Sequence, residues 1–111
     1  MITIKSTPEN NAKVAALKAV KEVHWVGEVV HDTMDKALIA INLFQGSPNS
    51  GWYKPQAVRL GGVQGIFMIN EDGGLNFESR IVKTDKGYKI EHLSNDGYNA
   101  FESKYFQSKT F

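Results

Sequence analysis

An α+β fold, with the whole chain of residues 1–111 forming a single domain, is predicted from three observations. Turn-forming residues divide Leu60–Leu93 into runs rich in β-branched and aromatic residues, alanines recur at helical spacing over residues 11–21, and an aromatic segment behind a capping residue ends the chain. We expect a three- to five-stranded, mainly antiparallel sheet, with a meander over residues 57–93. Two or three helices should cover one face of it, because a sheet buries its apolar face against another layer.

The strands are predicted from the turns that separate them. Residues 70–74 and residues 84–87 supply Asn, Asp and Gly, the residue types that hairpin turns use where φ is positive. Gly61-Gly62 marks a bend that either splits one long strand or separates two. Polar residues alternate with apolar ones along the later strands and predict one solvated face of mixed charge. These residues are Asn76, Glu78, Arg80, Lys89 and Glu91.

The helices are predicted from their capping residues and their apolar spacing. A first helix over residues 11–21 follows Ser6-Thr7, where either hydroxyl can cap it. A second helix is predicted to begin at Asp32 as its cap. A last helix over residues 97–107 follows Ser94. The helical material therefore lies on both sides of the meander in the sequence.

Residues 23–31 are compatible with a strand or with a helix, and both alternatives stay open. If residues 22–36 formed one helix, four side chains of types that bind Zn, Mn or Fe would share a face. These are His24, Glu28, His31 and Asp35. A metal-dependent hydrolase is therefore one alternative. The pattern is not a HExxH motif, however, and a solvated helix face or two unrelated histidines flanking a strand explain it without a metal, so we expect no metal site and no cofactor.

Composition excludes several classes of protein. The chain has no cysteine, which excludes disulfides, thiolate catalysis and cysteine-based metal sites. Thirteen basic against twelve acidic residues lack the basic excess of a typical nucleic-acid binder. The longest apolar segment is far shorter than the ~20 residues of a membrane span, and Met1–Ile4 lacks the features of a signal peptide. With no catalytic signature either, we expect a cytoplasmic protein that is not an enzyme.

The loop over residues 46–54 is the main candidate for binding, because it is long, polar and ends in an aromatic pair beside a lysine. Aromatic rings next to a cation serve both protein interfaces and base stacking, although a tryptophan such as Trp52 also plugs protein cores. The predicted binding residues are Trp52, Tyr53, Lys54, Arg59 and Arg80. We expect an interaction module, an inhibitor or adaptor, that binds a protein partner through this loop and the adjoining sheet edge. The alternative is a protein that binds single-stranded nucleic acid.

The C-terminal segment is rich in aromatic residues. Five rings occur within fourteen residues: Tyr98, Phe101, Tyr105, Phe106 and Phe111. Most are expected to pack in the core, but one small helix cannot easily bury all five. A homodimer through these C-terminal aromatics is therefore a further expectation.

Overall fold

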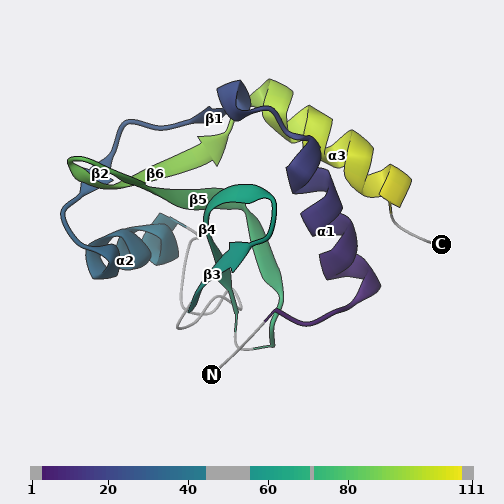
Figure 1. Ribbon diagram of the computed structural model, residues 1–111, viewed down its shortest axis with the longest axis horizontal. Helices are drawn as coiled ribbons and strands as arrows, with labels where there is room; N and C mark the ends of the chain where they lie inside the picture. The colour runs from purple at the N-terminus through teal and green to yellow at the C-terminus, as the bar shows by residue number, and fades with distance from the viewer. Residues whose placement is uncertain (1–3, 45–55, 71, 109–111) are drawn as a thin grey trace.

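The structure, a computed structural model, describes residues 4–44, 56–70 and 72–108 (Figure 1). Its elements are, in chain order, α1 (Pro8–Ala19), the 3-10 turn η1 (Glu22–His24), β1 (Trp25–Val26), β2 (Val30–His31), α2 (Met34–Phe44), β3 (Gln56–Leu60), β4 (Val63–Ile69), β5 (Leu75–Thr84), β6 (Gly87–Leu93) and α3 (Asn95–Ser108). The described residues form the predicted α+β fold.

The strands form one antiparallel sheet. Its order is β1-β6-β5-β4-β3, and β2 also pairs with β6. The predicted meander is confirmed as β3 to β6, and Gly61-Gly62 separates two strands, with Gly62 at φ 80° in the turn. The two-residue strands β1 and β2 bring the sheet to six strands, one more than the upper limit that the sequence predicts.

Helices lie on both faces of this sheet. Figure 1 shows α1 and α3 side by side over one face and α2 at the other. Two helices thus cover one face, as predicted, and the third covers the opposite face. The apolar run Ile66–Ile69 in β4 explains why, because successive side chains of a strand point to opposite faces and all four are buried. Phe67 packs beneath α1 and α3, whereas Met68 packs beneath α2.

The helix caps agree with the sequence at two of three positions. Thr7 and Ser94 cap α1 and α3 through their side-chain oxygens. In α2 the capping residue is Thr33 rather than Asp32, since the backbone N–H of Lys36 donates to Thr33 Oγ1 at 3.2 Å. Asp32 instead forms an ion pair with the side chain of Lys36, at 3.0 Å. α2 therefore begins one residue later than the predicted cap, Asp32, implies.

Val23 and His24 belong to the 3-10 turn η1, and residues 25–31 run along the outer side of β6 and make the two short strands β1 and β2, so residues 23–31 do not form one continuous helix. Gly27 lies between them, against the backbone of β6. A Cβ at Gly27 would collide with the carbonyl oxygen of Ile90, so only glycine allows so close an approach. The next contact along is a hydrogen bond in which the N–H of Ile90 donates to the carbonyl of Val29, at 3.0 Å. The segment is thereby held against the sheet.

Candidate functional site

Of the five predicted binding residues, the structure describes Arg59 and Arg80. Trp52, Tyr53 and Lys54, with the rest of the 46–54 loop, lie outside the described residues. Arg59 is exposed on β3, the strand at one end of the sheet. Arg80 is on β5 in the middle of the sheet, and its side chain is only 2% exposed.

Arg80 is buried, whereas its place in the alternation of the strand predicts an exposed side chain. Its Nε and Nη2 lie 3.0 and 2.9 Å from Oε1 of Glu91, whose side chain is also nearly buried. Its remaining donors bond Glu22 and the carbonyl of Gln64, and its guanidinium lies 4.4 Å from the ring centroid of Trp25. With every edge of the guanidinium engaged, Arg80 has no donor left for a phosphate or a partner.

A change of register explains why the predicted polar face fails. Ile66 of β4 pairs with Ile81 of β5. Met68 lies only two residues after Ile66 in β4, but it pairs with Asn76, which lies five residues before Ile81 in β5. This irregularity shifts the alternation of β5, so side chains before and after it point to opposite faces. Arg80 consequently turns toward Trp25, and Asn76 is buried at 4% exposure. Glu91 is buried with Arg80, while Glu78 is exposed as predicted.

The hypothetical metal stripe is not assembled. His24 lies in η1, Glu28 lies between β1 and β2, and His31 lies in β2, so they do not share a helix face. Within residues 4–44, 56–70 and 72–108, no group of three or more His, Cys, Asp or Glu side chains is placed to hold a metal ion. The hydrolase alternative loses the geometry on which it depended.

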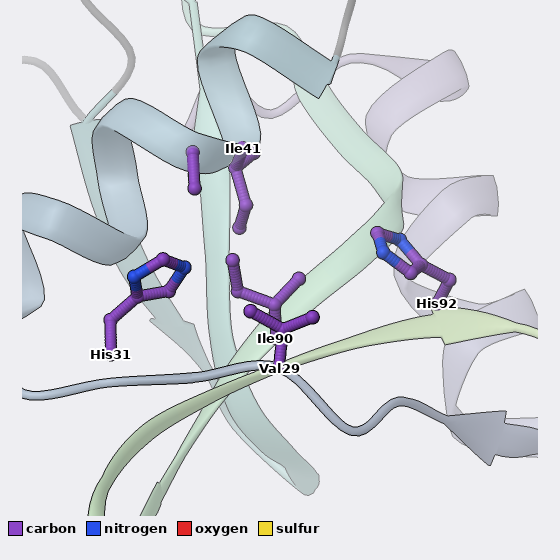
Figure 2. A pocket seen from close by; sticks show the side chains of 6 residues that line it. Val29, His31, Ile41, Ile90 and His92 are labelled. Carbon is purple, nitrogen blue, oxygen red and sulfur yellow. The ribbon is translucent and has the colours of Figure 1, made fainter.

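A pocket of about 170 Å³ opens between α2, β2 and β6. Its lining consists of Val29, His31, Ala40, Ile41, Ile90 and His92. Figure 2 shows the two imidazole rings at opposite ends of the pocket, with the aliphatic side chains between them. Val29 stays 59% exposed at the rim, so the pocket is reached from solvent. We refer to it below as the histidine pocket.

The two histidines of this pocket have different surroundings. Nε2 of His31 is buried and has no hydrogen-bond partner in the part of the chain that the structure describes. Nδ1 of His92 lies 2.7 Å from Oγ of Ser79, its cross-strand neighbour on β5. Burial lowers the pKa of His92, which favours a neutral ring at neutral pH. A buried ring nitrogen without a partner is the feature of this pocket that most needs a ligand.

Among the described residues, the contact between Ser79 and His92 resembles a nucleophile beside a base. Ser79 is 1% exposed, however, so a substrate cannot reach its hydroxyl in this conformation. Its role is to hold the His92 ring at one end of the pocket.

The lowered pKa of His92 predicts a pH dependence of stability. The unfolded chain, with the ordinary value near 6.5, takes up a proton first as the pH falls, so protonation favours unfolding. This contribution is fully present above the ordinary pKa and is lost as the pH falls through the lowered pKa of the folded state. We expect the free energy of unfolding to drop in urea titrations as the pH falls below about 6.5, and to drop less in His92→Gln. Equal losses in both proteins would contradict the assignment.

A second surface feature is a group of exposed valines within residues 23–30 that sequence reasoning missed. Val23, Val26, Val29 and Val30 are 74%, 48%, 59% and 39% exposed, and they make up four of the seven large exposed hydrophobic side chains in the described residues. We call residues 23–30 the valine edge. The β-branched run was visible in the sequence, but nothing there indicated that it would form the outer side of a sheet.

The C-terminal aromatics divide between core and surface. Phe101 is buried and stacks on Phe77 with ring centroids 4.2 Å apart, which confirms that this part of α3 covers the sheet. Tyr98 and Phe106 are 39% and 52% exposed, and Phe111 lies outside the described residues. The homodimer through these rings stays a prediction.

Comparison with protein-family models, with curated proteins and with solved structures finds no match to this chain. Among the described residues, no helix combines the length and the apolar character that crossing a membrane requires. The valine edge and the histidine pocket are the two surface features from which a function can be argued.

Proposed function

We propose that the protein is a non-enzymatic interaction module of the cytoplasm that binds a protein partner along the valine edge. The observation that carries this proposal is the exposure of four valines within eight residues at one end of the sheet. Exposed apolar surface concentrated in this way is typical of protein interaction sites, because covering it removes apolar area from water.

The valine edge is also held in place before a partner arrives. β1 and β2 pair with β6, and Gly27 lets the segment between them lie against the backbone of Ile90. A surface that is already ordered loses little conformational entropy on binding. Glu28 is exposed between Val26 and Val29. The partner that fits therefore presents apolar side chains next to a lysine or arginine.

Replacing three valines by threonine tests this surface. The variant Val23→Thr, Val26→Thr, Val30→Thr keeps the β-branched shape of each side chain but replaces a methyl group by a hydroxyl. At about 0.5 kcal/mol for each replaced methyl, we expect the partner's affinity to fall about tenfold. The measurement is capture by the tagged chain, followed by titration of the captured protein against each variant.

Ile39→Thr is the matched control, since Ile39 is 61% exposed on α2 and lies outside the valine edge. It should bind the partner like the unchanged chain. Full retention by the triple variant, or equal loss in both proteins, would contradict the proposal. A valine-dependent dimer in sedimentation experiments would identify a second copy, not a different protein, as the occupant. Capture that nuclease abolishes would favour the nucleic-acid alternative.

The 46–54 loop and the adjoining strand β3 are proposed as a second contact surface. β3 and β1 lie at opposite ends of the sheet, so a partner on one does not block the other. Arg59 is exposed on β3 and stays available for binding. The same capture experiment with alanine at Trp52 and Tyr53 tests this surface separately from the valine edge.

A further inference from the structure

We infer that the histidine pocket binds a small, neutral, hydroxylated ring compound, with phenol and the methylphenols as the chemical class. The site lies between α2, β2 and β6 and goes beyond the proposed protein interaction, although Val29, at the rim of the pocket, belongs to both surfaces. Three properties of the pocket lead to this class: its volume, its one unpartnered nitrogen and its lack of a fixed charge.

The volume sets the size of the ligand. A protein cavity of about 150 Å³ lined by aliphatic side chains takes up benzene. At about 170 Å³ the histidine pocket has room for one six-membered ring with one or two small substituents. Ile41 from α2 and Ile90 from β6 supply aliphatic walls against which the faces of such a ring can pack (Figure 2). Ala40 of α2 also lines the pocket.

The unpartnered nitrogen determines which polar group the ligand must carry. Nε2 of His31 is buried beside the pocket without a hydrogen bond, and its ring stands at one end of the aliphatic walls (Figure 2). A buried polar atom in this state costs free energy that a ligand recovers once the His31 side chain, which lines the pocket, turns so that Nε2 faces the ligand. A neutral imidazole nitrogen donates in one tautomer and accepts in the other. A hydroxyl group bonds to either, because it is both donor and acceptor.

The charge of the lining excludes an ionised ligand. No lysine, arginine or acidic residue lines the pocket among the residues that the structure describes. His92, at the other end, is favoured in its neutral form because burial lowers its pKa. A carboxylate would therefore lose its hydration without gaining a fixed cation. A phenol buries its ring and places one neutral hydroxyl at His31.

The experiment is an NMR titration of the full chain, carrying labelled isoleucine methyl groups, with phenol, toluene and benzoate in turn. A ligand of this size should bind with a Kd on the order of 1 mM. We expect phenol to shift the methyl signals of Ile41 and Ile90 saturably. Toluene lacks the hydroxyl and should bind about fivefold more weakly, the effect of one hydrogen bond. Benzoate should cause no saturable shift at these methyl groups.

Three variants locate the interaction. His31→Leu should remove the preference for phenol over toluene, whereas His31→Gln, which offers an amide in place of the ring nitrogen, should keep it. Ala40→Leu fills the pocket from a helix position and should abolish binding of both ligands, which keeps the test valid if His31→Leu fails to fold. Ile39→Leu, on the exposed side of the same helix, is the matched control and should bind phenol normally.

Several results would overturn the inference. Shifts that do not saturate, or that appear equally at methyl groups away from the pocket, would show that phenol binds nonspecifically. Equal affinity for phenol and toluene would show an apolar pocket that does not recognise a hydroxyl. Tighter binding of benzoate would show that the class is an anion. The two proposals are tested separately, because the three valine replacements leave all six lining residues, Val29 included, unchanged.

Discussion

Alanine in place of Arg80 is expected to lower the free energy of unfolding by about 3 kcal/mol, because it leaves a carboxylate buried without its main partner. The guanidinium lies within 3.0 Å of Glu91, and the side chains of the two residues are 2% and 10% exposed. Lys89 Nζ, at 3.2 Å from the other oxygen of Glu91, keeps part of the charge compensated. Urea denaturation followed by circular dichroism measures the change.

Two further variants test the cause of this loss. Arg59 is also a predicted binding residue, but its side chain is exposed. The variant Arg59→Ala should therefore change the free energy of unfolding by less than about 0.5 kcal/mol. Adding Glu91→Gln to Arg80→Ala should recover part of the lost stability, since the unpaired charge is then absent. If the double variant is no more stable than Arg80→Ala alone, the buried carboxylate is not the source of the loss.

Alanine in place of Gly27 is the second change with a large expected effect. The added Cβ would overlap the carbonyl oxygen of Ile90, so residues 25–31 must move away from β6. We expect a loss of about 3 kcal/mol in stability, at the upper end for overpacking, together with weaker capture of the partner at the displaced valine edge. Urea denaturation and the capture titration measure the two effects.

Gly61→Ala is the matched control for Gly27→Ala. Gly61 lies in the turn between β3 and β4, and a Cβ there has open space around it. Its replacement should change stability by less than about 1 kcal/mol and leave capture unchanged. A Gly27→Ala variant as stable as Gly61→Ala would show that the segment carrying β1 and β2 is not held tightly against β6.

Much of the architecture follows from local signals in the sequence. The hairpin turns need residues that accept positive φ, and Gly73 and Gly87 stand at φ 80° and 135° in the two turns that the sequence predicts. Ser94 and Thr7 start helices because their side chains bond to backbone N–H groups one turn on. These interactions involve residues close in the chain, so a single sequence is enough to identify them.

The outcomes that the sequence could not predict depend on contacts between distant residues. Alternation along β5 placed Arg80 on a solvated face, but the irregular pairing with β4 turned it inward against Trp25, fifty-five residues earlier in the chain. Gly65 makes that possible, since a Cβ there would lie 2.8 Å from Cδ of Arg80. Register is a property of two strands together, and neither strand alone specifies it.

In the candidate site, too, some features follow from local sequence signals and others depend on contacts between distant residues. By itself the sequence determined that the chain is an α+β domain with a β-meander, without cysteine chemistry or a catalytic signature, because composition and turn residues act locally. Only the tertiary structure decided that residues 25–31 lie along β6, that α2 covers the second face of the sheet, and that His31 and His92 face one pocket. These depend on which apolar surfaces pack together, and that packing is chosen by the whole chain rather than by any one segment.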